Sequence, residues 1–271
     1  MSKGNEMLKY IAALLLMTSA AYAAEQLPPK PVESCKVQIP HGMPVTNESS
    51  DIIICRTGYI LAHDIDARIP DWVAWTLTPE RVIGCIPRTD AFAADQSIPA
   101  GQRAELTDYD RSGYDQGHLA NNADLSWDAQ AQKESFLLSN MSPQLPSVNR
   151  GVWKNLEQAE RAWVYATQHS FTIYAGNIYS SDSKTIGSNK VVVPDFLYKI
   201  LVDNVTKMSY SFIMPHKNGL DSDFTKYQTT LFDIETVSGM IFPVPDDKMK
   251  INTVPTTDLR SYADKKKQIC K

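Results

Sequence analysis

His118 and three later side chains, Asn140, Asn149 and Glu157, are the residues of this sequence whose types and order could perform chemistry. Between about pH 6 and 8 an imidazole with a pKa near ~6.5 is largely a free base, so it can take a proton from an attacking water. A hard cation such as Mg²⁺ accepts one or two protein oxygens and completes its octahedron with waters and phosphate. The set therefore predicts one metal ion held against a phosphate, with His118 as the general base.

Each of the three later side chains has an expected role. Asn149 is expected to bind the metal directly through its side-chain oxygen. Glu157 lies eight positions later, roughly 12 Å along a helix axis, so it is expected to orient metal-bound water from outside the inner sphere. Asn140 is expected to hydrogen-bond His118 or the scissile phosphate. Taken alone, the three could equally be a helix cap, a solvated ion-pair partner and a turn residue. A structural role is expected for the other histidines, His41, His63, His169 and His216.

The segments around these residues resemble the DNA/RNA non-specific endonuclease family, the endonuclease G-like ββα-metal (His-Me finger) nucleases. The resemblance extends from about Tyr59 through Phe242 and is carried by three stretches, 108–120, 139–144 and 149–157. It implies an α+β fold with a central, mostly antiparallel sheet flanked by helices. It also implies Mg²⁺-dependent cleavage of DNA and RNA, with Mn²⁺ as a substitute, and a water-orienting role for Glu157.

The expected reaction is hydrolysis of a phosphodiester bond. His118 takes a proton from a water that attacks phosphorus in line, and the metal stabilises the developing charge and the departing 3′ oxygen. The products should carry 5′-phosphates. Groups that contact phosphate and metal rather than base edges read no sequence and need no 2′-hydroxyl, so DNA and RNA are both expected substrates.

Four side chains are expected to contact the substrate, namely Arg88, Arg111, Gln116 and Arg161. Arg88 matches the family arginine that contacts phosphate. Gln116 departs from the family, which usually has Asp-Arg-Gly-His where this chain has Asp-Gln-Gly-His, so one phosphate-facing cation is missing. Arg111, in a neighbouring loop, is expected to replace part of that charge. Arg161 is expected to pair with Glu157 one helical turn away.

The departure at Gln116 leaves a second function open. In that alternative the chain is an exported nucleic-acid-binding protein on a nuclease fold, with weak or lost catalysis. A third interpretation, a disulfide-stapled structural or adhesive domain, would leave the combination of His118, Asn140 and Asn149 unexplained.

Composition indicates one globular domain without an overall basic character. The chain has 271 residues, 43% of them hydrophobic, and a formal net charge of −4. Proteins that bind nucleic acid tightly usually carry excess lysine and arginine, because phosphate neutralisation supplies their affinity. Any positive patch must therefore be local, and the balance favours an enzyme that releases its product.

The N-terminus is typical of a secretory signal peptide. Lys3 and Lys9 precede the apolar run 10–17, and Ala21-Tyr22-Ala23 supplies the small residues of a cleavage site. We expect a signal peptide over 1–23, an N-terminal arm over 24–50 and the nuclease domain over 51–271. An uncleaved anchor is disfavoured because the run falls short of the ~20 residues that span a bilayer. The mature protein is expected in the periplasm or outside the cell, without stable membrane association, and a homodimer is left open.

The cysteines indicate two disulfides. An exported chain with the even set Cys35, Cys55, Cys85 and Cys270 is expected to oxidise them, and three pairings are allowed. The favoured pairing joins Cys35 to Cys55 and Cys85 to Cys270. A zinc site is disfavoured, because no Cys-x-x-Cys pair is present.

Hydrophobic patterning predicts alternating strands and helices around the motif. Strands are expected over 58–64, 71–77, 171–179, 191–202, with Pro194 at a sheet edge, and 208–214. Helices are expected over 128–134, over 149–168, where Asn149 begins the helix, and over 228–238, where Gly239 ends it.

Overall fold

The computed structural model describes residues 26–46 and 52–270 of the chain. The predicted signal peptide, residues 1–23, lies outside the described residues. Across the part that is described, no helix combines the length and apolar character needed to cross a bilayer.

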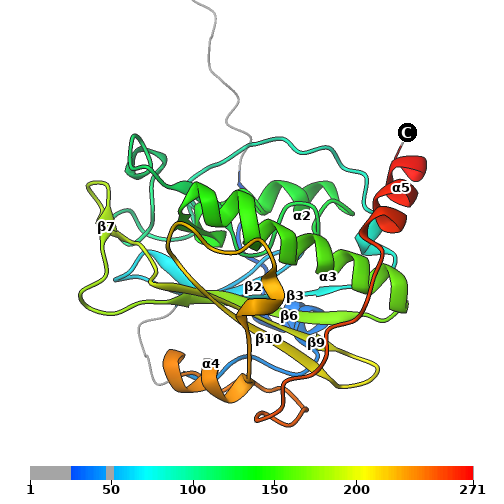
Figure 1. Ribbon diagram of the computed structural model, residues 1–271. Coiled ribbons are helices and arrows are strands. Elements are labelled where there is room, and N and C mark those ends of the chain that lie inside the picture. The colour runs from blue at the N-terminus through cyan, green and yellow to red at the C-terminus, as the bar shows by residue number, and fades with distance from the viewer. Residues whose placement is uncertain (1–25, 47–51, 271) are drawn as a thin grey trace, which may run out of the picture.

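A seven-stranded antiparallel sheet forms the centre of the molecule (Figure 1). Its strand pairs confirm the predicted antiparallel sheet, and the segments predicted as strands over 58–64 and 71–77 pair with each other. In spatial order the strands are β1 (Ile52–Cys55), β2 (Ile60–Asp64), β3 (Ile69–Leu77), β6 (Phe171–Ile178), β9 (Phe196–Asp203), β10 (Ser209–Pro215) and β11 (Gln228–Thr229).

Helices cover both faces of this sheet, so its central strands are buried on both sides. On one face lie α2 (Ala129–Glu134), α3 (Lys154–Thr167) and α5 (Leu259–Ile269), and on the other lies α4 (Leu231–Ser238) (Figure 1). Successive strand side chains point to opposite faces. Trp75 of β3 therefore joins the core under α3, whereas Trp72 joins the core on the α4 side.

A separate strand pair leads into α3 and forms the strand–strand–helix unit of the site. β4 (Asp115–His118) pairs antiparallel with β5 (Met141–Gln144), and His118 lies opposite Met141. The chain then passes through the wide helical turn η5 (Val148–Trp153) into α3. The pair β4–β5 is thus fixed to one end of α3.

Three predicted boundaries were wrong, each for a local reason. Regular helix starts at Lys154 rather than Asn149, because Gly151 has non-helical angles, φ −105° and ψ −116°. The segment 191–202 is two strands, β8 (Val191–Val192) and β9, because Pro194 lacks the N–H that a strand ladder needs. α4 starts only after Thr230, whose hydroxyl caps it by accepting from the Asp233 amide, while the preceding residues form β11.

The remaining elements are short. They are β7 (Thr185–Ile186), which pairs with β8, and the helical turns η1 (Val32–Gln38), η2 (Arg81–Ile83), η3 (Leu106–Asp108), η4 (Leu138–Asn140) and η6 (Phe224–Tyr227). The C-terminal limit of α4 was predicted correctly, because Gly239 adopts the left-handed φ of 70° that ends many helices.

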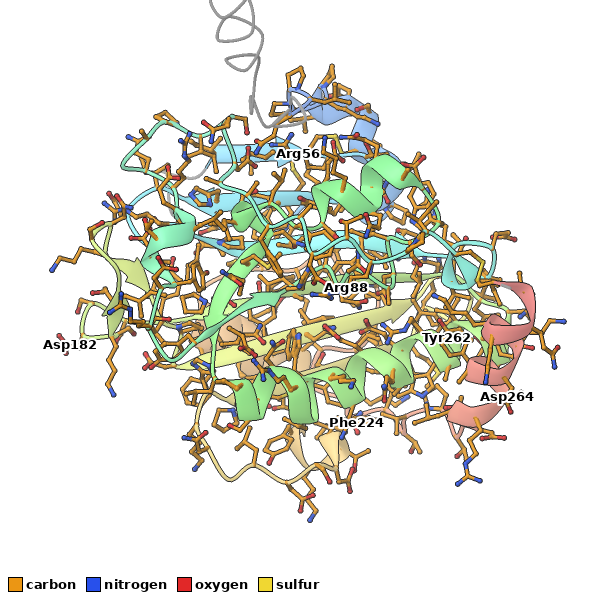
Figure 2. All side chains as sticks on the ribbon, turned by 90° about the horizontal axis from the view of Figure 1, so that it is seen from above. Arg56, Arg88, Asp182, Phe224, Tyr262 and Asp264 are labelled. Carbon is orange, nitrogen blue, oxygen red and sulfur yellow. A yellow bond between two sulfur atoms is a disulfide. The ribbon has the colours of Figure 1, made fainter. Side chains whose placement is uncertain are left out.

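Both predicted disulfides are confirmed. Cys35 of η1 bonds Cys55 of β1, and Cys85 bonds Cys270, which directly follows α5 (Figure 2 draws all side chains, with sulfur in yellow). Disulfides persist in oxidising compartments, so the pair of bridges indicates a location outside a reducing cytosol.

Candidate active site

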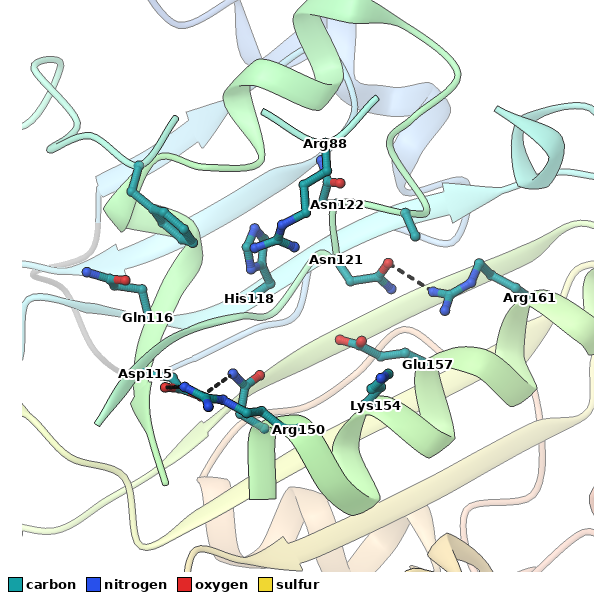
Figure 3. A pocket seen from close by; sticks show the side chains of 13 residues that line it. Arg88, Asp115, Gln116, His118, Asn121, Asn122, Arg150, Lys154, Glu157 and Arg161 are labelled. Atoms are coloured by element: carbon teal, nitrogen blue, oxygen red, sulfur yellow. Dashed lines mark hydrogen bonds and ion pairs between the residues drawn. The ribbon is translucent and has the colours of Figure 1, made fainter. Parts of the chain in front are cut away.

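A cavity of about 710 Å³ opens between β4, the turn η5 and the start of α3 (Figure 3). It brings together most of the predicted site residues, although they are spread over more than seventy positions of the chain. Among its lining residues are Arg88, Gln116, His118, Asn149, Glu157 and Arg161.

His118 is held in this cavity as a neutral imidazole. Its side chain is packed edge-on against Phe92 and Phe136, with ring centroids 5.6 and 5.1 Å away, and the residue is 8% exposed. This burial, together with the nearby Arg88 guanidinium, lowers the pKa of His118 to about 3. The Nε2 atom is buried and has no hydrogen-bond partner among the described residues. His118 is therefore unprotonated near neutral pH because burial lowers its pKa, and not because it has the ordinary pKa expected from sequence.

Asn140 does not reach the cavity, and its predicted direct contact with His118 or phosphate was wrong. The side chain is fully buried, its Oδ1 accepts from the Ala120 amide at 3.0 Å, and its Nδ2 donates to the carbonyls of Ala120 and Ser135. Asn140 instead clamps the backbone two residues after His118. Trp153 supports the same segment, because its Nε1 donates to the His118 carbonyl at 3.3 Å.

Asn149 is oriented by Asp115. Its Nδ2 donates to Asp115 Oδ2 at 2.9 Å, whereas its Oδ1 accepts no hydrogen bond from the described residues. A reversed amide would place two acceptor oxygens against each other, so the Asp115 carboxylate turns the Asn149 oxygen away from itself. The helix-cap alternative does not apply, because α3 begins five residues later and has no side-chain cap. Asn149 thus keeps one oxygen available as a ligand.

Glu157 lies on α3 and faces the same cavity (Figure 3). Burial raises the pKa of Glu157 to about 7, and the nearby cations Lys199 and Arg161 oppose that rise. The predicted Glu157–Arg161 pair does not form. Arg161 Nη1 instead donates to Asp124 Oδ1 and Asn121 Oδ1, both at 3.0 Å.

Cations outnumber acids in the cavity lining. Four basic side chains, Arg88, Arg150, Lys154 and Arg161, face two acidic ones, Asp115 and Glu157. This local excess agrees with the expectation that a chain of overall charge −4 would concentrate its positive charge. Arg88 is half-exposed, pairs with Asp90 at 2.5 Å and lies over the Phe136 ring.

Arg111 does not line the cavity, whereas Gln116 does. The predicted compensation of Gln116 by Arg111 is therefore not supported by the geometry. Arg150 lines the cavity and is the cation held next to Gln116. Its Nε and Nη2 donate to Asp115, the residue before Gln116, at 2.8 and 2.6 Å. Sequence reasoning missed Arg150 and Lys154, although both lie inside the recognised run 149–157.

The donor set suits a hard metal ion with few protein ligands. Within residues 26–46 and 52–270, no three His, Cys, Asp or Glu side chains are placed together to hold a metal. A zinc-like cage is therefore not formed by that part of the chain. The available Asn149 oxygen and the Glu157 carboxylate are oxygen donors, as Mg²⁺ prefers, and water and substrate can complete its octahedron.

A family model, two sequence relatives and one solved structure all relate this chain to nucleases. The family model described as DNA/RNA non-specific endonuclease matches residues 40–246. The chain is 31% identical over 202 residues to mitochondrial endonuclease G of Homo sapiens, covering 69% of this chain and 68% of that protein. It is 28% identical over 252 residues to a nuclease of Nostoc sp., covering 86% and 90%. A chain of the EndoG/EndoGI complex crystal structure superposes with a TM-score of 0.71 at 27% identity, covering 82% of this chain and 96% of that one.

Proposed function

Because the chain belongs to the DNA/RNA non-specific endonuclease family, we propose that it is a metal-dependent endonuclease that hydrolyses DNA and RNA without strong sequence preference. The products carry 5′-phosphates. The observation that carries the proposal is the neutral, unpartnered His118 Nε2 in a cavity that also holds the oriented oxygen of Asn149 and an excess of cations.

His118 acts as the general base. In the free protein its low pKa keeps it unprotonated at any physiological pH. A phosphate that enters the cavity brings negative charge next to the ring, and a nearby opposite charge favours the imidazolium form. Substrate binding thus strengthens the base at the step where it takes a proton from the attacking water.

Arg88 and Arg150 neutralise phosphate oxygens from opposite walls of the cavity. Both side chains are substantially exposed, and each is held by one carboxylate, Asp90 or Asp115. Arginine binds phosphate with a planar set of donors, and such charge-assisted hydrogen bonds are stronger than neutral ones. Arg150 offers the charge that is missing at Gln116.

Asn149 through Oδ1 and Glu157 through water would hold the Mg²⁺ or Mn²⁺ ion, which supplies charge stabilisation to the phosphate and its leaving oxygen. Asp115 keeps the Asn149 amide in the ligating orientation. Asn140 holds the backbone that follows His118, so it positions the base without contacting substrate.

We also propose that the protein is exported through a signal peptide over residues 1–23 and works in the periplasm or outside the cell. The sequence pattern of the N-terminus supports this proposal, and the two disulfides agree with it.

Plasmid digestion by the purified mature protein tests the activity. Cleavage is expected with Mg²⁺ and should stop with excess EDTA, and His118→Ala should lower the rate by at least ~10²-fold. His41→Ala is the matched control, because His41 bonds Asn204 outside the cavity. Cleavage that resists EDTA would contradict the metal requirement. Binding of DNA and RNA without cleavage in any metal would instead favour the nucleic-acid-binding alternative.

A further inference from the structure

A second hollow adjoins the active-site cavity along α3. It has a volume of about 610 Å³ and lies between the middle of α3 and the C-terminal helix α5. Ala123 and Arg161 line both hollows, so the two share a wall. Figure 2 shows α5, marked by Tyr262 and Asp264, at the end of α3, with Arg88 further along the same surface.

α5 is held firmly in this place. Cys270 attaches its end to Cys85, and the buried Tyr262 hydroxyl donates to the Val82 carbonyl at 2.9 Å. The helix lies beyond residue 246, where the match to the family model ends. Its surface is therefore a feature of this chain that the family pattern does not describe.

The second hollow is lined by cations and by no carboxylate. Arg161, Arg260, Lys266 and Lys267 contribute side chains to it. Arg260 and Lys267 are exposed, and neither forms an ion pair with a described residue. Lys266 is half-buried, and its pKa is lowered by that burial and then by Arg161, while Asp124 opposes the shift. Arg161 is already paired with the buried Asp124, so the net positive charge of the hollow comes from Arg260, Lys266 and Lys267, in a protein whose overall charge is −4.

The helix dipole of α5 explains the positions of only some of these cations. Lysines in the last turn, such as Lys266 and Lys267, are favourable near the negative end of the helix dipole. Arg260 is the second residue of α5, where the dipole disfavours a cation. Arg260 nevertheless lines the same hollow as the two lysines, two helical turns before them, so the helix dipole does not account for its position.

We propose that the α5 hollow, formed by Arg161, Arg260, Lys266 and Lys267, binds the sugar-phosphate backbone of a nucleic-acid strand whose scissile phosphate lies in the active-site cavity. This inference rests on the proposed function. Glu157 and Arg161 are one helical turn apart, about 6 Å, and one strand advances ~3.4 Å per phosphate along the duplex axis. The shared residues Ala123 and Arg161 therefore place the start of the hollow within a few nucleotides of the cleaved bond.

The double variant Arg260→Gln/Lys267→Gln tests the proposal with two exposed residues that leave Tyr262 and the disulfide intact. For a forty-nucleotide substrate we expect KM to rise about tenfold near 0.15 M salt. The salt dependence of binding should become shallower by roughly 1.4–1.8 in log–log slope, since two phosphate contacts are lost. The rate on bis(p-nitrophenyl) phosphate, which is too short to reach α5, should not change.

Lys184→Gln/Lys190→Gln is the matched control. Both lysines are exposed; Lys184 directly precedes β7 and Lys190 directly precedes its partner β8, and β7 lies on the opposite side of the molecule from α5 (Figure 1). This variant should keep the wild-type KM and salt dependence. Melting temperatures of both variants should equal that of the wild type.

Anisotropy of a labelled oligonucleotide in EDTA gives a readout that does not depend on cleavage. Weaker binding of the α5 variant alone would support the inference even if the protein proved to be a binder without activity. Unchanged oligonucleotide binding and KM in the α5 variant would overturn the inference while leaving the nuclease proposal intact. An equal loss on the long and short substrates would also overturn it, because α5 would then act on the catalytic site itself.

Discussion

Asp115 and Asn149 are joined by a 2.9 Å hydrogen bond in which the Asn149 amide donates to the carboxylate. The two residues come from β4 and from the turn η5, thirty-four positions apart in the chain. Because the amide nitrogen is committed to Asp115, the Asn149 oxygen is the atom left to face a cation. Groups that orient metal ligands in this way commonly matter almost as much as the ligands themselves.

Asp115→Asn should therefore weaken metal binding by ~10–100-fold. The substituted amide can donate as well as accept, so it no longer selects one orientation of Asn149, and it loses the charge that holds Arg150. Activity measured against Mg²⁺ concentration should show a higher half-saturation point, with partial recovery at high Mg²⁺. Asp110→Asn, an exposed carboxylate outside the cavity lining, is the control. An unchanged metal titration in Asp115→Asn would refute the orienting role.

Acid should destabilise the fold through His118. The folded pKa is about 3, whereas the unfolded chain has an ordinary value of about 6.5. Between these values the unfolded state binds a proton that the folded state does not, so the contribution is complete above about pH 6.5 and is lost as the pH falls toward 3. At pH 4.5 the loss is on the order of 2–3 kcal/mol of unfolding free energy.

Urea unfolding of the wild type and His118→Gln at pH 7.5 and 4.5 measures how much unfolding free energy His118 contributes at each pH. The variant should lose less stability than the wild type on acidification, because glutamine does not titrate. Equal losses would show that His118 is protonated in the folded state, contrary to its burial. In the wild type, the NMR signal of the His118 ring should show no protonation shift above about pH 5.

Arg150 rather than Arg111 should share the phosphate-binding task of the missing arginine at position 116. Arg150→Gln should lower kcat/KM by ~10-fold or more, since a charge-assisted contact contributes roughly 1.5–3 kcal/mol. Gln116→Arg should raise the efficiency of the wild type several-fold, steepen the salt dependence of binding and restore part of the loss in Arg150→Gln.

Arg111→Gln is the control for this series and should behave as the wild type, because Arg111 does not line the cavity. If Arg111→Gln were as damaging as Arg150→Gln, the loop 109–114 would have to contact substrate after all. A loss of activity in Gln116→Arg with the fold intact would indicate that the glutamine is adapted to its site.

The two disulfides should differ in their contribution to stability. In the chain-entropy model, a closed loop of 20 residues contributes about 3 kcal/mol and one of 185 residues about 5 kcal/mol. Cys85→Ser/Cys270→Ser should therefore lower the melting temperature more than Cys35→Ser/Cys55→Ser, and the wild type should contain no reactive thiol. The opposite ranking would mean that attaching η1 to β1 matters more than attaching α5.

Export should yield a mature chain that begins near Ala24. Small residues at positions 21 and 23 favour cleavage after Ala23. N-terminal sequencing of protein recovered from the periplasm or medium measures this directly. An N-terminus at Met1 on membrane-bound protein would contradict the predicted cleavage.

Local sequence patterns were sufficient for much of this molecule. Runs of aromatic and branched residues predicted most of the sheet strands, because these residue types favour a strand and pack well in a sheet that is covered on both faces. The even number of cysteines predicted two bridges, and the favoured pairing was correct. The types and order of His118, Asn149 and Glu157, together with the family resemblance, predicted that they would share one site, and the structure places all three in one cavity.

Tertiary contacts decided what each polar side chain does. Three side chains that suit the site by their chemistry have other roles in the fold. Asn140 hydrogen-bonds the backbone of Ala120, Arg111 lies outside the cavity lining, and Arg161 pairs with Asp124. A hydrogen-bonding partner and the degree of burial depend on residues distant in the chain, so no local pattern reveals them. For the same reason the sequence could nominate His118 as a candidate base, whereas only its packing against Phe92 and Phe136 makes the imidazole neutral.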